Sequence, residues 1–206
     1  LNILSLYCND VKDSFFSNEI NNKFIDDFSK NTKEQINFLS ETIDDFRDFF
    51  NPNKQKVVFE IKSAIEKSLK FMGNQFEINR VKVNIEYKDE KVYGIEIELE
   101  QVILNILSNS MDAFKERKMG NKEINIKVLS KQSYTILIME DNAGGVKEES
   151  LEKIFDPYYT TKSTGTGTGL YMVKLVVKNS LQGDLKINNS EKGLRYIIAL
   201  PQKEEN

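Results

Sequence analysis

The sequence predicts an α+β protein in which a helical hairpin precedes an α/β sandwich. Two observations support this division. Eight of the thirteen phenylalanines lie in the first fifty residues, and the first glycine is Gly73. Helix-like and strand-like patterns alternate after residue 56, which is typical of a sheet covered by helices. The composition changes near Pro52, so we divide the chain into a helical part, residues 1–52, and a sandwich, residues 53–206.

Residues 22–50 are expected to form one long helix. Apolar or small side chains recur there at alternating spacings of three and four, which places them on one helix face: Ile25, Phe28, Thr32, Ile36, Leu39, Ile43, Phe46 and Phe50. The nearest partner is an earlier helix over residues 1–16, joined by a turn at 17–21. Because two helices alone bury little surface, we expect residues 1–50 to form a homodimer, a dimeric four-helix bundle. Packing against the second domain is the alternative.

The sandwich begins after Pro52, which cannot continue a helix and disfavours helical backbone in the residue before it. Apolar periodicity predicts helices over residues 57–72, 98–117 and 169–180. It predicts strands over residues 81–87, 124–128, 134–139, 185–188 and 194–200. Neighbouring strands are expected to pair largely antiparallel, with the helices covering one face of the sheet.

Composition excludes several kinds of chemistry within this chain. The 206 residues include one cysteine, Cys8, and no histidine, which excludes an internal disulfide, a cysteine-rich metal site and histidine-based catalysis. The net charge of −3 gives no strong attraction for nucleic acid, and we expect no nucleic-acid partner. No membrane span or signal peptide is visible, so we expect a cytoplasmic protein. Because the first residue is Leu1, we expect a longer parent chain, and any inner-membrane anchor would lie upstream.

The helix expected over residues 98–117 carries a narrow polar stripe on an otherwise apolar surface. At about 100° per residue, the stripe comprises Glu98, Gln101, Asn105, Ser108, Asn109 and Asp112. Asn105 and Asn109 are one helical turn apart, so their neutral oxygens lie side by side and suit a hard cation that also contacts phosphate. Taken alone, a plain amphipathic helix would be the better interpretation.

A second motif, Met139-Glu-Asp-Asn-Ala-Gly-Gly145, directly follows an expected strand. Small residues after an acidic one allow a ligand to approach the backbone closely. Asp141 could then accept a hydrogen bond from an exocyclic amine such as that of adenine. The same residues are also good turn formers, so this motif alone is weak evidence.

A third motif, residues 154–170, contains three alternating glycines and interleaved threonines that lead into a helix at Gly169. Backbone N–H groups at a helix start bind anions, and the glycines let phosphates approach. The glycine spacing fits neither a P-loop nor a Rossmann turn. A disordered linker is the alternative, and the embedded Phe155-Asp-Pro-Tyr-Tyr159 speaks against it.

The order and spacing of these three motifs resemble the ATP-binding catalytic domain of sensor histidine kinases, within the wider group of GHKL-type ATPases. The resemblance implies ATP and Mg²⁺ as cofactors, with Asn109 and Asn105 at the magnesium and Asp141 reading the adenine amine. It implies catalytic roles for Asn105, Asn109 and Lys162. The implied ATP-binding residues are Asn109, Asp112, Asp141, Ala143, Gly145, Tyr159, Thr160, Thr161, Lys162, Gly165, Thr166, Gly167, Thr168, Gly169 and Leu170.

Three positions depart from the family pattern. Ala143 replaces a usual glycine, which is tolerable unless the backbone there needs positive φ. Asp112 stands where many members carry a lysine, so charge compensation at the phosphates would fall to Lys115 or Lys162. Thr168 replaces a common leucine.

The first fifty residues resemble the end of the family's dimerisation and phosphotransfer hairpin. Residues 42–50 match the end of its second helix, and Leu1-Asn2 match residues just after the histidine-containing motif. The resemblance therefore implies an acceptor histidine a few residues upstream of Leu1, and relay of the phosphate to an aspartate on a response-regulator receiver domain.

Other functions of the same fold make different demands. ATP-driven clamps carry a glutamate four residues before the magnesium asparagine, where it activates water; this chain has Asn105, and an amide cannot accept a proton at neutral pH. A serine kinase of the anti-sigma type would lack the long paired helices. The presence of Asn109, Asp141 and the three alternating glycines at 165, 167 and 169 speaks against a pseudokinase that only binds ATP. The histidine kinase is therefore the preferred prediction.

The absence of histidine gives a first test. We expect the chain as printed to bind Mg-ATP without labelling itself when incubated with γ-labelled ATP, because it holds no histidine to accept the phosphate. Acid-labile phosphate on this chain would contradict the prediction.

Overall fold

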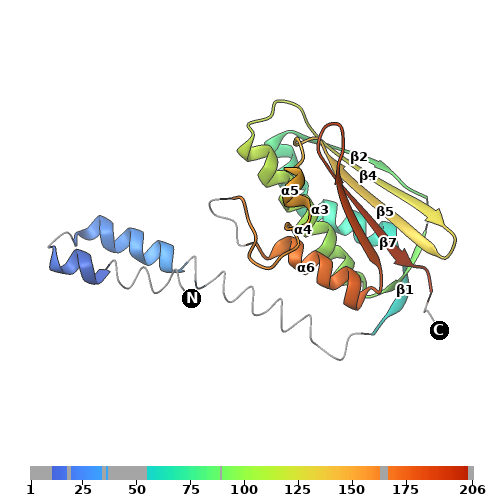
Figure 1. Ribbon diagram of the computed structural model, residues 1–206, viewed down its shortest axis with the longest axis horizontal. Coiled ribbons are helices and arrows are strands. Elements are labelled where there is room, and N and C mark those ends of the chain that lie inside the picture. Colours follow the sequence, from blue (N-terminus) through green and yellow to red (C-terminus); the bar gives the residue numbers. More distant parts are fainter. Residues whose placement is uncertain are drawn as a thin grey trace. The chain divides into compact units, whose positions relative to one another are not determined.

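A computed structural model of the chain describes residues 11–17, 20–33, 36, 55–88, 90–162 and 167–203 (Figure 1). The chain divides into two units, Leu1–Asn53 and Lys54–Asn206.

In the first unit, residues 11–16 and 22–33 are helical. Asn21 caps the second of these helices, since its side-chain Oδ1 accepts a hydrogen bond from the Phe24 N–H at 3.0 Å. Ile25 and Ile36, from the expected apolar seam, are 47% and 49% exposed. The remainder of the predicted hairpin, residues 1–10, 18–19, 34–35 and 37–52, lies outside the described residues. The homodimer through residues 1–50 stays a prediction.

The second unit begins with strand β1 (Val57–Glu60), helix α3 (Ile61–Asn79), strands β2 (Val81–Glu86) and β3 (Lys91–Gly94), and helix α4 (Glu96–Glu116). Strands β4 (Lys122–Lys131) and β5 (Tyr134–Asp141) follow, then the short helix α5 (Glu148–Leu151) and helix α6 (Gly169–Leu175). The last turn of α6 runs into a π-helical segment, Val176–Ser180, and strands β6 (Asp184–Asn189) and β7 (Leu194–Pro201) end the unit.

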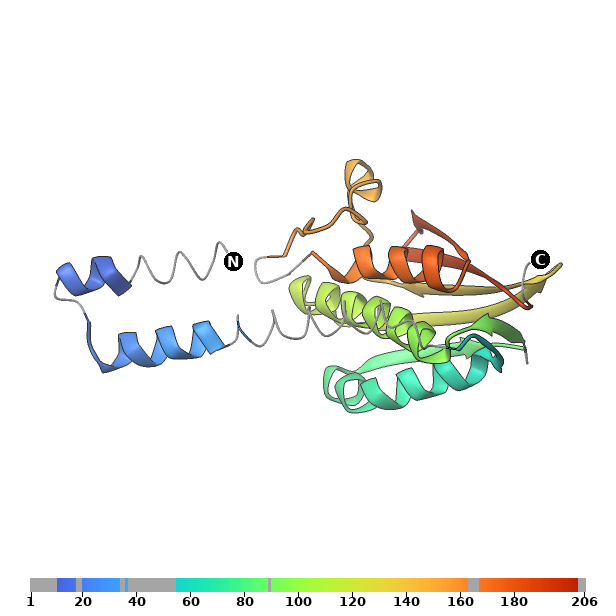
Figure 2. The same ribbon diagram turned by 90° about the horizontal axis from the view of Figure 1, so that it is seen from below.

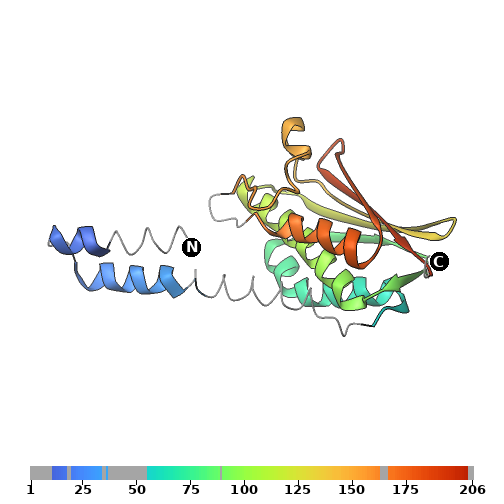
Figure 3. The ribbon, with the colours of Figure 1, turned by 60° about the horizontal axis from the view of Figure 1, so that its bottom comes forward.

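The main sheet has five strands in the order β2-β4-β5-β7-β6. β2 pairs with β4 in parallel and the other neighbours are antiparallel. Helices α3, α4 and α6 lie side by side against one face of this sheet, with α4 between the other two (Figures 2 and 3). The prediction of an α+β fold with helices on one face is confirmed.

Strand alternation decides which side chains face the helices. Along β5 every second residue is buried, from Thr135 through Leu137 and Met139 to Asp141. Met139 is opposite Tyr196 and Leu137 is opposite Ile198 on β7, and these partners are buried too. Because side chains on a strand alternate between faces, Asp141 belongs to the row that faces the helices. The last residue of β5 therefore directs a carboxylate toward α4.

Helix α4 supplies much of the core. Seven of its apolar side chains are at most 1% exposed: Leu99, Val102, Ile103, Ile106, Leu107, Met111 and Phe114. Full burial of one such side chain is worth about 1.5–3 kcal/mol, so this face anchors the helix firmly against the sheet. The polar residues near its C-terminal half are thereby held at fixed positions.

The predicted secondary structure differs from the observed one in three details. Residues 57–60 form a strand rather than the start of a helix, because Val57, Val58 and Phe59 are β-branched or aromatic and pair antiparallel with β3. Strand β3 was not predicted, since four residues carry too little periodicity. The helix predicted over residues 169–180 changes from α-helical to π-helical geometry at Val176.

Candidate functional site

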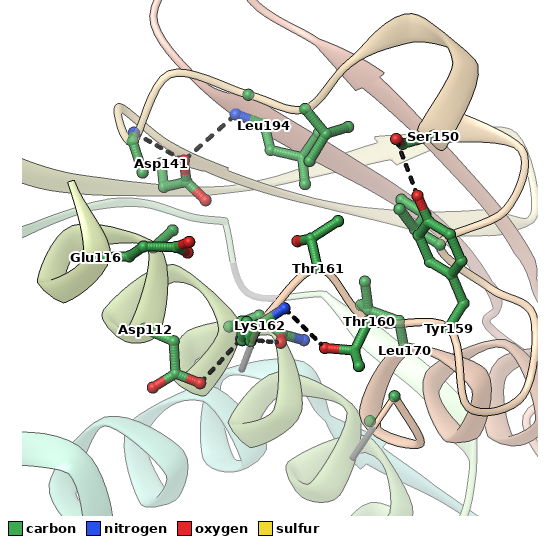
Figure 4. Close-up of a pocket in the computed structure, with 18 of the residues that line it drawn as sticks. Asp112, Glu116, Asp141, Ser150, Tyr159, Thr160, Thr161, Lys162, Leu170 and Leu194 are labelled. Atoms are coloured by element: carbon green, nitrogen blue, oxygen red, sulfur yellow. Dashed lines mark hydrogen bonds and ion pairs between the residues drawn. The ribbon is translucent and has the colours of Figure 1, made fainter. Parts of the chain in front are cut away.

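A cavity of about 680 Å³ lies between α4, the segment after β5, the described residues before position 163 and after position 166, and β7 (Figure 4). All but two of the residues predicted to bind nucleotide line it: Asn105, Asn109, Asp112, Asp141, Ala143, Gly145, Tyr159, Thr160, Thr161, Lys162, Gly167, Thr168, Gly169 and Leu170. Gly165 and Thr166 lie outside the described residues. Residues far apart in sequence thus form one cavity.

Asp141 lies at the bottom of the cavity and is 5% exposed. Its Oδ2 accepts a hydrogen bond from the Ser110 hydroxyl of α4 at 2.8 Å. Its Oδ1 accepts from the backbone N–H groups of Ala143 at 2.9 Å and Leu194 at 3.3 Å (Figure 4). A buried carboxylate needs such donors to offset its lost hydration. These contacts fix the orientation of the carboxylate toward the cavity.

The wall beside Asp141 is apolar. Ile154, Leu194 and Tyr196 line it and are at most 8% exposed. Burial raises the pKa of Tyr196 well above its usual value, and the negative charge of Asp141 adds to this effect. The Tyr196 phenol therefore stays neutral. An apolar wall with one acceptor of hydrogen bonds suits a flat, partly apolar ligand that carries a donor.

The opposite part of the cavity is charged. The Lys162 ammonium group donates to Asn109 Oδ1 at 3.1 Å and to Asp112 Oδ2 at 2.9 Å, so it connects the 159–162 segment to α4 (Figure 4). Both charged side chains are partly exposed, 27% for Lys162 and 45% for Asp112. Of the two lysines considered for charge compensation, Lys162 lines the cavity, whereas Lys115 is exposed and is not among the lining residues.

Asn105 and Asn109 face the start of α6. A Cβ built on Gly169 would be 3.8 Å from Asn105 Oδ1 and 3.9 Å from Asn109 Nδ2. Asn109 Oδ1 already accepts a hydrogen bond from the positively charged ammonium group of Lys162. Within the described ranges, no cluster of three or more Asp, Glu, Cys or His side chains could hold a metal ion. Neutral amide oxygens plus a ligand's phosphates would fit Mg²⁺, which keeps few protein ligands.

The segment that carries Lys162 is held at both described ends. The Tyr158 N–H donates to the Gly167 carbonyl at 3.0 Å. The Tyr159 hydroxyl donates to Ser150 Oγ at 3.0 Å (Figure 4). The first contact joins residues 158 and 167 to each other, and the second joins Tyr159 to α5, so these residues are held beside the cavity.

The predicted polar stripe of α4 does not act as one unit. Asn105, Ser108, Asn109 and Asp112 line the cavity, whereas Glu98 and Gln101 do not. Glu98 is 2% exposed and accepts a hydrogen bond from the Ser180 hydroxyl at the end of the π-helical segment. The first turns of α4 face the neighbouring helical segment, and the later turns face the cavity.

Several residues of the site were not predicted from the sequence. Ser110, Arg117, Ser150, Asn189 and Gly193 each contact a residue of the cavity. A polar Ser110 on the apolar side of α4 was a usable signal, because buried hydroxyls need a partner. Ala143 is not among the residues with positive φ, so its methyl group is accommodated at this position.

Comparisons with known proteins agree with this geometry. The model of the histidine kinase-, DNA gyrase B- and HSP90-like ATPases matches residues 94–204. Sporulation kinase B of Bacillus subtilis (strain 168) is 27% identical over 191 residues, which cover 91% of this chain and 44% of that protein. The chain therefore spans less than half the length of this curated relative.

Two solved structures share the fold. The Acinetobacter baumannii histidine kinase AdeS is 17% identical with a TM-score of 0.73, covering 98% of this chain and 95% of that chain. The histidine kinase ThkA in complex with response regulator protein TrrA is 17% identical with a TM-score of 0.66, covering 97% of this chain and 57% of that chain.

The chain therefore belongs to the family of histidine kinase-, DNA gyrase B- and HSP90-like ATPases. Its relatives within that family are sporulation and sensor kinases, so its sandwich is the catalytic domain of the sensor histidine kinase type. No helix in the part of the chain that the structure describes has the length and apolar character to cross a membrane.

The turn between β6 and β7 gives a test of the site's packing. We expect Gly193→Ala to lower the free energy of unfolding by about 1–3 kcal/mol, because its Cβ would clash with the Asp141 carbonyl oxygen. Urea-induced unfolding followed by circular dichroism measures this loss. Gly120→Ala, outside any helix, is the control, since nothing lies within 4 Å of its Cβ. A Gly193→Ala chain as stable as this control would contradict the close contact.

Proposed function

We propose that this chain is the kinase core of a two-component sensor kinase, which binds Mg-ATP in the cavity and transfers the γ-phosphate to a histidine. The observation that carries the proposal is the single cavity with two contrasting ends. One end holds the buried acceptor Asp141 beside apolar side chains, and the other holds Asn105, Asn109, Asp112 and Lys162. Adenine suits the first end and a magnesium triphosphate suits the second.

At the base end, the adenine amine would donate to Asp141. The carboxylate already receives three hydrogen bonds that set its direction, and its two oxygens retain room for another donor. The apolar surfaces of Ile154 and Leu194 would contact the ring. Guanine carries a carbonyl oxygen where adenine carries its amine, so the same carboxylate would disfavour it.

At the phosphate end, Asn109 and Asn105 would provide amide oxygens for the metal, and Lys162 would provide a positive charge. Magnesium, when bound, neutralises phosphate charge and orients the triphosphate. The Lys162 ammonium group is hydrogen-bonded to Asn109 Oδ1 and Asp112 Oδ2, and it would need to move only a short distance from these oxygens to contact a phosphate oxygen. Tyr159, Thr160 and Thr161 would enclose the same region, and Gly169, which lies beside Asn105 and Asn109, would leave space for the phosphates.

The chemistry is phosphoryl transfer by positioning rather than by proton abstraction. The accepting imidazole is itself a nucleophile, so the site needs no strong base. Asn105 lines the cavity where a water-activating carboxylate would be needed for an ATP-driven clamp, and an amide cannot serve as that base. The acceptor histidine must come from outside this chain, which holds none, and we place it upstream of Leu1.

We further propose a homodimer through residues 1–50 and a response-regulator receiver domain as the partner. The support for the partner is the likeness in fold to ThkA, whose structure contains a response regulator. The receiver's aspartate would take the phosphate from the histidine.

Binding of the base is tested with Asp141→Asn. The amide oxygen can keep the bonds to Ala143 and Leu194, and its NH₂ group can face the Ser110 oxygen, so the fold should be retained. The side chain then loses its carboxylate acceptor, and we expect the affinity for ATP, measured by calorimetry with Mg²⁺, to fall at least about tenfold, a change of about 1.4 kcal/mol. Glu140→Gln is the matched control, because Glu140 pairs with Arg195 and does not line the cavity. Equal affinities for the two variants would contradict the role of Asp141.

Transfer is tested with the protein extended upstream of Leu1. With γ-labelled ATP and Mg²⁺, we expect acid-labile phosphate on a histidine of the added segment. Asn109→Asp should abolish this labelling, because it places another negative charge beside the phosphates and replaces the amide ligand. Chelation of Mg²⁺ should do the same. Labelling that survives both changes would contradict the proposed phosphate end.

A further inference from the structure

The loop from Asp141 to Val146 forms part of the cavity wall and contains two consecutive residues with positive φ. Gly144 and Gly145 have φ of +87° and +66°, in the left-handed region that favours glycine. The loop lies between β5 and α5, so no strand or helix bonds define its shape. Its conformation depends on the side chains that contact it and on two backbone bonds, from the Asn142 N–H to the Glu123 carbonyl at 3.2 Å and from the Gly144 N–H to the Lys192 carbonyl at 2.7 Å.

Arg117 holds one side of this loop. It is the first residue after α4, and its guanidinium donates to the carbonyl oxygens of Ala143 and Gly145, the latter at 2.6 Å. The planar fork of an arginine presents two donors with fixed geometry, which suits two carbonyls on either side of one glycine. These two bonds attach the loop to the C-terminal end of α4.

Asn189 holds the other side. It ends β6, and its Oδ1 accepts from the Val146 N–H at 2.9 Å while its Nδ2 donates to the Val146 carbonyl at 2.7 Å. The side-chain amide thus pairs with Val146 as a neighbouring strand would. The Asn189 side chain approaches closely, because a Cβ on Gly145 would clash with Asn189 Oδ1.

The loop and the carboxylate are coupled directly. The Ala143 N–H bonds to Asp141 Oδ1, and the Gly144 N–H bonds to the Lys192 carbonyl at 2.7 Å. A shift of the loop would therefore alter one of the three hydrogen bonds that hold the Asp141 carboxylate. We propose that Arg117 and Asn189 are positioning residues, which hold the 141–146 loop so that Asp141 meets the nucleotide base in one fixed direction. This proposal rests on the proposed function for the identity of the ligand.

The physical consequence concerns base discrimination. A carboxylate held in one direction accepts a hydrogen bond from an adenine amine and repels a guanine carbonyl oxygen. A carboxylate that is free to rotate can turn away from the guanine oxygen, so it discriminates less. Loss of either residue should therefore weaken ATP more than GTP. Partial unfolding alone would lower binding of both nucleotides by the same factor, so the ratio separates the two explanations.

The experiment measures dissociation constants of ATP, ADP and GTP for the chain and its variants by competition against a fluorescent nucleotide. For Arg117→Ala we expect about tenfold weaker ATP and ADP binding, a change of about 1.4 kcal/mol, with little change for GTP. Arg117→Lys, which keeps the positive charge but lacks the planar fork of two nitrogens, should be intermediate, and Asn189→Ala should act in the same direction as Arg117→Ala. Lys115→Ala is the matched control, since it removes one positive charge from the same end of α4 without lining the cavity.

The possible outcomes are distinct. An unchanged ratio of ATP to GTP affinity in both Arg117→Ala and Asn189→Ala overturns the positioning role. An equal loss for all three nucleotides also overturns it, because that result indicates a charge effect or a folding defect. If Arg117→Ala does not fold, Arg117→Lys and Asn189→Ala decide the question by the same ratio. A wild-type chain that fails to bind ATP, or does not prefer it to GTP, refutes the proposed function instead.

Discussion

The site depends on the burial of one carboxylate. Asp141 is nearly inaccessible to water, and a carboxylate there is stable only if donors surround it. Those donors come from α4, from the loop that follows β5, and from the start of β7, through Ser110, Ala143 and Leu194. The helix layer, the loop and the end of the sheet must therefore meet at this point. The strand alternation of β5 is what turns the carboxylate to the helix side, and the apolar packing of α4 is what holds Ser110 opposite to it.

The two ends of the cavity are built by different physical means. Around Asp141 the contacts are hydrogen bonds from the Ser110 hydroxyl and two backbone N–H groups to a buried carboxylate, so their geometry is rigid and depends little on ionic strength. Around Lys162 the contacts are between partly exposed charges on flexible side chains, which exchange partners easily and are screened by salt. In the function that we propose, the first end would recognise the ligand and the second would adapt as phosphate is transferred. This division places selectivity on the rigid sheet end and chemistry on the adaptable segment.

Much of this arrangement could be predicted from the sequence, because local patterns carried it. The alternation of residues 134–139 and 194–200 predicted the strands, and the three motifs predicted most of the residues that line the cavity. The sequence could not show contacts that exist only after folding, such as Arg117 with the Ala143 carbonyl or Asn189 with Val146, since each joins distant segments through a backbone atom. Strand β1 was missed because its partner β3 is itself four residues long. The split of the α4 stripe at Glu98 required knowing that the neighbouring helical segment ends beside it at Ser180.

The close contact at Gly193 has a consequence for how such sequences diverge. The backbone of this turn touches the strand end that carries Asp141, and Leu194, which bonds to the carboxylate, lies 53 positions from it in the sequence. A mutation at Asp141 and a mutation at the turn therefore affect the same few atoms. Surface turns usually accept substitutions and insertions freely, but this one has no room for a side chain. Among diverging copies of this chain, the hairpin turn should accordingly change as slowly as the acidic residue that it covers, although nothing in its own local sequence marks it as part of a binding site.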